Sequence, residues 1–316
     1  MDMRAFDCFK KQGSWYKGNL HSHTVNSDGF ATPEQVVDWY SKNGYDFLAI
    51  TDHDFITDVS PFAQNEMLVI PGIEFGYRPT ENPDFYLDML GVNISSIPSF
   101  LDPDKTGHIV YDRSISPQKI IDAVNAEGGL AIMCHPYFMI NMTEPYMTYH
   151  SYIGMEAYNY VCEEMCGRGY HEVYWDAMLK RGRRILGFAS DDSHWPQFGY
   201  AWIEVKAKEK SIPAILQAIR EGEFYSTTGI KIFDIDVSGN TVKVSFDRPC
   251  DAVFMPGSNF LERKCVVRAH ENTYELIDGK PRFFAEAEVP SSDPYLRIEL
   301  IDSTGKKAYT NPVYFR

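Results

Sequence analysis

The feature that most constrains this chain is a histidine pair, His21 and His23, two positions apart near the N-terminus. On an extended strand, side chains alternate between the two faces, so residues i and i+2 point the same way. Both imidazoles can therefore reach one metal ion. An isolated pair of this kind also occurs on ordinary strands, so its meaning depends on what later segments supply.

Length and charge limit the classes of function. The 316 residues are enough for one large domain and a smaller one. The formal net charge of −14 repels a phosphate backbone, so we expect no long nucleic acid as a partner. Small phosphorylated substrates stay open, because a bound metal ion reverses the local electric field. The sequence leaves the oligomeric state open.

The sequence also bears on where the protein works. No apolar run is long enough to span a bilayer, and residues 1–11 lack the apolar core of a signal peptide. The six cysteines are scattered and form no dense disulfide framework. We therefore expect a cytoplasmic protein that has no membrane partner and keeps its thiols reduced.

Helical and extended patterns alternate between residues 20 and 220. A helix is predicted at 32–40, where Thr32 is the N-cap, Pro33 the first residue and Gln35 the capping-box partner. Further helices are predicted at 116–126, 173–181 and 212–220, and strands at 20–24, 45–51, 67–70, 86–94, 130–133, 153–158 and 185–189. This alternation implies parallel strands with crossover helices, and about seven such strands predict an α/β fold built as a βα barrel.

The pattern changes near Gly229. Beyond it, short apolar–polar alternations are separated by turn signals, such as those at 238–240 and 256–257, and show no helical period. We predict two domains, a barrel at 1–228 and a small antiparallel sandwich-like β domain at 229–316. We interpret the β domain as structural support or a dimer contact, with carbohydrate binding as the alternative.

Acidic and imidazole side chains recur where the predicted strands end. They are His21, His23, Asp28, His53, Glu74, His135, Asp192 and His194. Asp192 and His194 repeat the i, i+2 spacing of the first pair. Strands that converge at one barrel mouth would bring these groups together, and burying them costs free energy unless they bind a cation. Mixed nitrogen and oxygen donors without a thiolate suit zinc, manganese or iron.

Five segments resemble the PHP (polymerase and histidinol phosphatase) metal-dependent hydrolases. They are His21-Ser22-His23 with Ser27-Asp28-Gly29, Thr51-Asp52-His53, Pro71-Gly72-Ile73-Glu74, His135-Pro136 and Asp192-Ser193-His194. This resemblance covers residues 17 to about 230 and implies a distorted seven-stranded βα barrel. Segments 175–179, 222–229 and 295–299, with 311–312, are similar to the carbaryl-hydrolase-like group of that family, whose members often carry a β domain after the barrel.

The resemblance implies three adjoining metal sites and two or three divalent ions. The first site takes His21, His23, Glu74 and Asp192, the second Glu74 and His135, and the third Asp28, His53 and His194. One position departs from the family, because Asp88 stands where the second site usually has a histidine. Asp88 either ligates or leaves that site weak and only partly occupied.

The reaction that the resemblance implies is hydrolysis by a metal-activated hydroxide that bridges the first two ions. We assign catalytic roles to Glu74, Asp192 and His194, and we expect the metals to neutralise the phosphate oxygens. Asp52 precedes one ligand and is expected to orient a histidine from behind.

Substrate contacts are expected from loops. Arg113 and Arg168 lie in predicted loops, and either could grip a phosphate through its planar guanidinium. His150 and His171 match no motif and are interpreted as structural. The leading hypothesis is a metal-dependent phosphoesterase that acts on a small phosphomonoester or phosphodiester. Two alternatives stay open: a hydrolase of carboxyl or carbamate esters or amides with the same metal centre, and a non-catalytic binding module.

Overall fold

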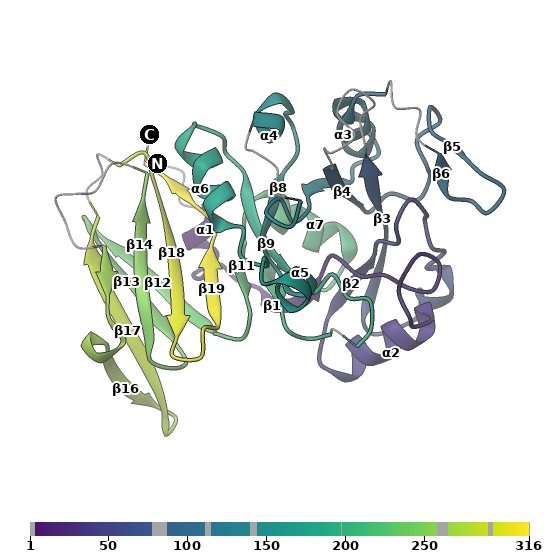
Figure 1. Cartoon of the computed structure of the whole chain (residues 1–316). Helices are drawn as coiled ribbons and strands as arrows, with labels where there is room; N and C mark the ends of the chain where they lie inside the picture. The colour runs from purple at the N-terminus through teal and green to yellow at the C-terminus, as the bar shows by residue number, and fades with distance from the viewer. Residues whose placement is uncertain are drawn as a thin grey trace. The chain divides into compact units, whose positions relative to one another are not determined.

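The computed structural model describes residues 4–77, 87–110, 115–139, 144–196, 198–257, 265–289 and 293–315 (Figure 1). The helices are α1 (Arg4–Asp7), α2 (Pro33–Lys42), α3 (Pro117–Ala126), α4 (Glu144–Thr148), α5 (Tyr160–Cys166), α6 (Glu172–Lys180) and α7 (Ile212–Arg220), with short 3₁₀ turns η1 (Ser60–Phe62) and η2 (Ala269–Glu271). The first strands are β1 (Ser14–Asn19), β2 (Phe47–Ile50), β3 (Leu68–Tyr77), β4 (Leu87–Val92), β5 (Asp102–Pro103), β6 (Ile109–Val110), β7 (Leu130–Met133), β8 (Gly154–Asn159), β9 (Leu186–Ser190) and β10 (Trp202–Ala207). The later strands are β11 (Phe224–Thr227), β12 (Ile232–Ser238), β13 (Thr241–Phe246), β14 (Cys250–Pro256), β15 (Val266–Val267), β16 (Thr273–Ile277), β17 (Lys280–Glu288), β18 (Tyr295–Asp302), β19 (Lys307–Thr310) and β20 (Val313–Tyr314).

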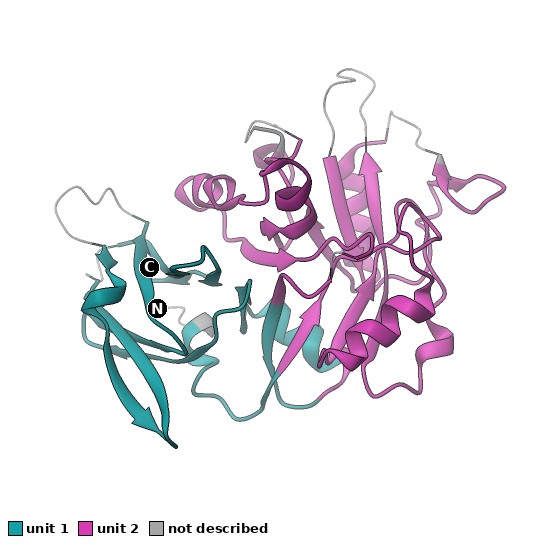
Figure 2. Ribbon diagram, turned by 60° about the horizontal axis from the view of Figure 1, so that its bottom comes forward, with its two compact units in different colours: residues 1–15, 203–209, 213–316 teal, residues 16–202, 210–212 magenta. Residues whose placement is uncertain are grey.

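The chain divides into two compact units, which Figure 2 shows in two colours. Unit 1 contains residues 1–15, 203–209 and 213–316, and unit 2 contains residues 16–202 and 210–212. Unit 1 thus includes segments that precede the predicted boundary between residues 228 and 229, and that boundary stays a prediction. None of the described helices has both the length and the apolar character that crossing a bilayer requires.

Unit 2 is a mixed α/β fold. Its strands pair in the order β1-β2-β3-β4-β7-β8-β9. The pairs β1–β2, β2–β3, β7–β8 and β8–β9 are parallel, as the alternation of strands and helices predicts. β4, however, is antiparallel to both β3 and β7, so the prediction of parallel strands throughout is wrong.

The direction of β4 follows from the length of the chain before it. β3 continues to Tyr77, well past the predicted end at residue 70, which leaves only residues 78–86 before β4 begins. A parallel pair needs a crossover connection of about a dozen residues or more. The spacing between β3 and β4 is too short for such a crossover, and the antiparallel pairing agrees with it.

The predicted closed barrel is not confirmed. Beyond the ends of β1 and β9, Ser22 and Ser193 form an isolated parallel bridge, and the His23 N–H donates to the Ser193 carbonyl at 2.9 Å. Among the residues that the structure describes, β1 and β9 do not pair with each other as strands. The two ends of the strand row are therefore linked at the level of these loops, which is where the candidate ligands lie.

Helix α2 begins as the sequence predicts. The Thr32 hydroxyl accepts a hydrogen bond from the Gln35 N–H (3.3 Å), and the Gln35 side chain accepts one from the Thr32 N–H (2.9 Å). Val36, Val37 and Tyr40 form its buried face and share a core cluster with side chains of β2. Burial of each large apolar side chain contributes roughly 1.5–3 kcal/mol, so this face holds the helix against the sheet.

Unit 1 consists mainly of antiparallel strands. One row runs β15-β14-β18-β19-β11-β10, with β20 on β18, and a separate sheet has the order β12-β13-β17-β16. Alternate side chains of β18 and β13, including Ile298, Leu300, Val242 and Val244, share one buried core. The antiparallel pairing agrees with the prediction for 229–316, but β11 precedes that range, so a sandwich confined to it is not confirmed.

Candidate metal centre

Residues 21–23 lie just past the end of β1, and not on a strand as predicted. The hydroxyl of Ser22 donates to the Ala49 carbonyl at 2.7 Å, and the backbone on either side is tied to Thr51 and Ser193. These bonds keep the segment extended between β2 and the loop after β9. Both imidazoles therefore still point to one side, with their Nε2 atoms 3.1 Å apart.

The first group of ligand atoms comes from His21, His23, Glu74 and Asp192, all of them buried. His21 Nε2 lies 2.9 Å from Glu74 Oε2 and 3.1 Å from Asp192 Oδ1. His23 Nε2 lies 3.1 and 3.0 Å from the same two oxygens. The ligand atoms of a tetrahedral zinc ion are roughly 3.3 Å apart, so these four atoms are spaced as they would be around one cation.

Asp192 Oδ1 gives an independent test of that fit. No described group makes a well-directed hydrogen bond to this buried oxygen, and the Nε2 atoms of His21 and His23, 3.1 and 3.0 Å away, pair with it only when their rings are protonated. A buried carboxylate oxygen without a donor costs free energy, which a divalent cation would remove. Two imidazoles and two carboxylates are also donors that zinc, manganese and iron accept. The residues present therefore fit a divalent metal ion.

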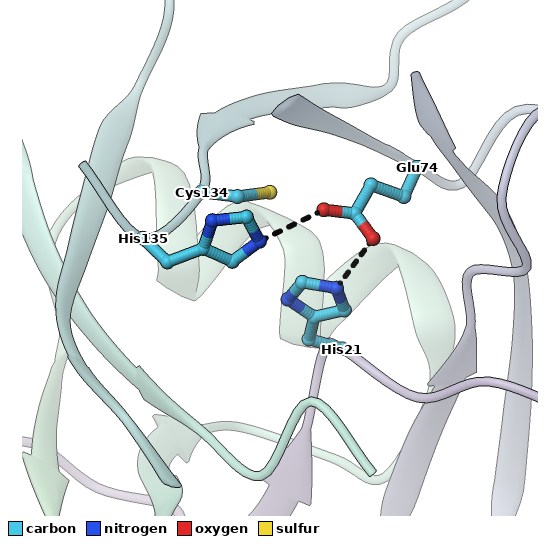
Figure 3. A group of neighbouring side chains, drawn as sticks. All are labelled: His21, Glu74, Cys134 and His135. Carbon is cyan, nitrogen blue, oxygen red and sulfur yellow. Dashed lines mark hydrogen bonds and ion pairs between the residues drawn. The ribbon is translucent and has the colours of Figure 1, made fainter. Parts of the chain in front are cut away.

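Glu74 joins the first group to a second one. It lies inside β3 and not at the end of a strand as predicted, and it is fully buried opposite Leu90 of β4. Its Oε2 faces the first group, while its Oε1 lies 3.2 Å from His135 Nε2 (Figure 3). One carboxylate thus faces two adjacent clusters, as the resemblance implies for a bridging ligand.

The second group contains a thiol that the sequence analysis did not assign. Ligand atoms of His21, Glu74, Cys134 and His135 lie within 4.8 Å of one another (Figure 3). Asp88, the predicted ligand, is buried nearby but belongs to none of the three groups found among the described residues. Burial and the neighbouring Glu74 raise the pKa of Asp88 to about 7.

The third group combines His23, Asp28, His53 and His194. Asp28 carboxylate oxygens lie 3.2 Å from His194 Nε2 and 3.7 Å from both His23 Nδ1 and His53 Nε2. The His194 Nδ1 is 2.8 Å from the Asp192 carbonyl, which fixes Nδ1 as the donor and leaves Nε2 facing Asp28. The Asp28 side chain is 59% exposed, so this group is the one most open to solvent.

Charge in the cluster is strongly coupled. Burial alone would lower the pKa of His23 and of His135. The neighbouring carboxylates of Asp192 and Glu74 outweigh burial and raise the pKa of His23 to about 10 and that of His135 to about 9. Burial alone would raise the pKa of Glu74, yet the histidines hold it well below its usual value. Without a metal, protons thus balance the carboxylates. Because a ligating imidazole must be neutral, metal binding would release protons.

Three residues at or beside this site have a left-handed backbone conformation. Asp54, His135 and Asp192 have φ values of 55°, 21° and 52°, although none of them is glycine. Such conformations cost of order 1–3 kcal/mol each and tend to cluster at functional sites. The surrounding fold therefore holds these side chains in orientations that a relaxed chain would avoid.

Glu156 of β8 is a site residue that the sequence analysis missed. Its Oε1 lies 2.8 Å from His21 Nδ1, and its Oε2 accepts hydrogen bonds from the His135 N–H and the Asn159 amide, both at 2.9 Å. The Ser190 hydroxyl also donates to Glu156. A carboxylate in this position fixes the orientation of a ligating imidazole. The signal was an acidic residue inside an otherwise buried strand.

Asp52 has a different role from the one expected. Its carboxylate accepts hydrogen bonds from the Thr24 N–H, the Thr24 hydroxyl and the Ser27 hydroxyl, at 2.6, 2.8 and 2.8 Å, and from Thr57 at 2.5 Å. It therefore holds the loop that carries His23 and Asp28, and these bonds do not orient a histidine directly.

Only one of the two arginines expected to bind substrate lies within the described residues. Arg113 lies outside the described residues. Arg168 is partly buried, and its guanidinium lies 5.8 Å from the ring centroid of Tyr137, two residues after His135. Its assignment to the substrate stays a prediction.

One solved structure shares the architecture of this chain. It is a crystal structure of a two-domain protein from Bacteroides vulgatus, described as containing a predicted PHP-like metal-dependent phosphoesterase. The match covers 98% of this chain and 96% of that one, with 15% sequence identity and a TM-score of 0.51. The two chains share a fold. At this identity the likeness concerns the architecture alone.

Sequence comparison finds shorter matches. No protein-family model matches the chain. A segment is 37% identical over 84 residues to the 5'-3' exoribonuclease Rnm of Salmonella typhimurium, and 34% identical over 83 residues to Rnm of Escherichia coli. Each match covers 24% of this chain and 28% of the relative, so the chain matches little more than a quarter of these proteins.

Proposed function

We propose that this protein is a metal-dependent phosphoesterase of the PHP type. The observation that carries the proposal is that three groups of ligand atoms adjoin one another. Glu74 is shared between the first and second groups, and His23 between the first and third. A centre of this kind suits hydrolysis, because bound divalent ions polarise a phosphate ester and lower the pKa of a water molecule.

The residues of the chain have separable parts in this proposal. Glu74 presents one oxygen to each of two sites, which fixes their separation. Glu156 holds His21 from behind, so that Nε2 faces the site. His194 belongs to the more exposed third group and Asp192 lies beside it, and we propose that the substrate approaches from that side. Glu74, Asp192 and His194 remain our proposed catalytic residues.

We propose a small phosphomonoester or phosphodiester as the substrate. The net charge of −14 disfavours a long polyanion, whereas cations in the centre would attract a small phosphate group. Arg168 is our proposed phosphate contact within the described residues. The similarity of three further segments to the carbaryl-hydrolase-like group keeps a carboxyl or carbamate ester, or an amide, as an alternative substrate.

The segment match to Rnm favours a second candidate function, cleavage at the 5′ end of RNA. The two candidates differ in substrate length and share the metal centre. A 5′-phosphorylated oligoribonucleotide therefore belongs in the same panel as the small esters, and its turnover relative to a nucleoside monophosphate distinguishes the two.

The test begins with metal analysis of the purified full-length protein. Activity is then measured with added Mn²⁺ or Zn²⁺ on p-nitrophenyl phosphate, bis-p-nitrophenyl phosphate, a 5′-phosphorylated oligoribonucleotide and p-nitrophenyl acetate. His21→Ala removes a ligand, and His150→Ala is the matched control because His150 is exposed and outside the three groups. We expect metal-dependent phosphate release that His21→Ala abolishes and His150→Ala retains.

Two results would overturn the proposal. Turnover of acyl esters alone would replace the phosphoesterase by a carboxyl ester hydrolase with the same centre. No metal and no turnover, together with ligand binding that His21→Ala leaves unchanged, would favour a non-catalytic binding module.

A further inference from the structure

We infer that Cys134 is a ligand of the second metal site, so that this site has a cysteine, a histidine and a carboxylate as donors and prefers a soft divalent ion such as zinc. The inference rests on the proposed metal centre. It goes beyond that proposal because the donors expected from the sequence include no thiolate, and the one further ligand considered for the second site is Asp88.

Backbone geometry places Cys134 in the site. The residue follows β7 directly, and its N–H donates to the Asp88 carbonyl at 3.0 Å, which extends the pairing with β4 by one step. Neighbouring residues on a strand point to opposite faces. Here the chain turns at His135, whose φ of 21° is outside the extended region, and both side chains reach Glu74 (Figure 3).

The position of the sulfur favours ligation. The Cys134 side chain is buried, and its Sγ lies 4.0 Å from the Ile132 carbonyl, at the outer limit of a sulfur hydrogen bond. This hydrogen bond therefore contributes little to the stability of the buried thiol. Sγ is grouped instead with ligand atoms of His21, Glu74 and His135, all within 4.8 Å of one another.

The distances in the second group are close to those around a tetrahedral ion. Zinc binds sulfur at about 2.3 Å and nitrogen at about 2.0–2.1 Å, so its ligand atoms are separated by roughly 3.3–3.8 Å. His135 Nε2 lies 3.2 Å from Glu74 Oε1, and the Cys134 Sγ lies within 4.8 Å of a ligand atom of each of these two residues. Short side-chain movements would place Cys134, His135 and Glu74 around one cation, while His21 Nε2 stays with the first group.

Asp88 lies beside the second group of ligand atoms and does not take the place of Cys134 in it. It pairs with Gly76 in the register of β3 and β4, two residues along from Glu74. The Asp88 and Asp54 carboxylates lie 3.6 and 3.5 Å from the position that a Cβ on Gly76 would take, so Asp88 lies next to a second carboxylate. The thiol is therefore the donor that completes the second group among the described residues.

The choice of donor changes the choice of metal. A thiolate favours zinc, cobalt(II) or iron(II), whereas carboxylate-rich sites favour manganese and magnesium. We therefore expect the second site to retain zinc under conditions in which manganese exchanges freely into the third group, whose donors are imidazoles and an exposed carboxylate.

The experiment uses the full chain, freed of metal by chelation and titrated with Co²⁺. A cobalt–thiolate bond gives a charge-transfer absorption band in the near ultraviolet. We expect this band in the wild type and in Cys162→Ser, a buried cysteine of the same unit that lies outside the three groups, and no band in Cys134→Ser. Zinc content should fall by one equivalent in Cys134→Ser, and zinc affinity of that site should weaken by more than the roughly 10- to 100-fold that loss of a ligand's hydrogen-bond partner costs.

The outcomes separate the two proposals. If the wild type binds cobalt without the band, or if Cys134→Ser keeps both the band and its full zinc content, the inference about Cys134 is wrong while the metal centre stands. If the wild type binds no metal, the proposed function fails as well. Cys134→Ala is measured in parallel, and circular dichroism of the variants shows that each one folds.

Discussion

The carboxylate of Glu156 offers the sharpest test of how the centre is built. Glu156→Gln keeps the size of the side chain but removes its charge and one acceptor oxygen. In the wild type, Oε1 faces His21 Nδ1 at 2.8 Å, while Oε2 accepts from the His135 and Asn159 N–H groups at 2.9 Å each. A glutamine amide cannot satisfy both sides, because its nitrogen would face either the ring N–H or two other donors.

The loss of metal affinity expected in Glu156→Gln can be given a magnitude. Removing the carboxylate that orients a ligating histidine typically lowers metal affinity by 10- to 100-fold, or about 1.4–2.7 kcal/mol. We therefore expect the zinc dissociation constant of the tightest site to rise by that factor in Glu156→Gln. The measurement is competition of the metal-free protein with a chromophoric chelator at fixed pH.

Glu163→Gln is the matched control. Glu163 also accepts a hydrogen bond from a backbone N–H, that of Gly169 at 2.9 Å, but it lies outside the three groups of ligand atoms. Its substitution should leave zinc affinity unchanged. The reasoning is refuted if Glu156→Gln binds zinc within twofold of the wild type, or if Glu163→Gln weakens binding to the same extent.

Other predictions concern stability. Burial lowers the pKa of His171 to about 3, below the value near 6.5 of an unfolded histidine. The stability that the neutral ring contributes is therefore present above pH 6.5 and is lost as the pH falls. In urea unfolding, the free energy of unfolding should fall by up to about 2 kcal/mol between pH 6.5 and 5, and by less in His171→Gln. If the stability of His171→Gln fell by the same amount over this pH range, groups other than His171 would be responsible for the pH dependence. Thr32→Ala removes the N-cap of α2 and should cost about 1 kcal/mol in urea unfolding, whereas Thr32→Ser should retain most of it. Chelation should lower the melting temperature, and added zinc should restore it. A free zinc concentration of 100 times the dissociation constant would add about 2.7 kcal/mol to the free energy of unfolding. A melting temperature that responds to neither chelation nor zinc would contradict a metal bound in the native state.

Local sequence patterns anticipated much of the ligand set. His21, His23 and His135 were predicted from their places beside apolar runs, and the structure brings them together with Glu74. The start of α2 was also predicted correctly, because a capping box depends on residues only three positions apart. These features share one property: the interactions that create them are short-range or follow strand periodicity.

Other features were not visible in the local pattern. α5 was missed because Asn159 ends a predicted strand and at the same time caps the helix that follows it. The extended continuation of β3 past residue 70 was missed because Pro71 and Gly72 are typical of turns, yet both lie within the paired strand. In β3, pairing with the neighbouring strands outweighed local preference.

The sequence by itself predicted most of the candidate ligands and the neighbouring apolar runs, because apolar periodicity and capping act over a few residues. Only the tertiary structure decided which of them meet. The direction of β4, the turn at His135 that exposes Cys134 to Glu74, and the support of His21 by Glu156 all depend on contacts between segments far apart in the chain. Such contacts are fixed by register and by a few strained dihedral angles, and neither leaves a periodic signal in the sequence.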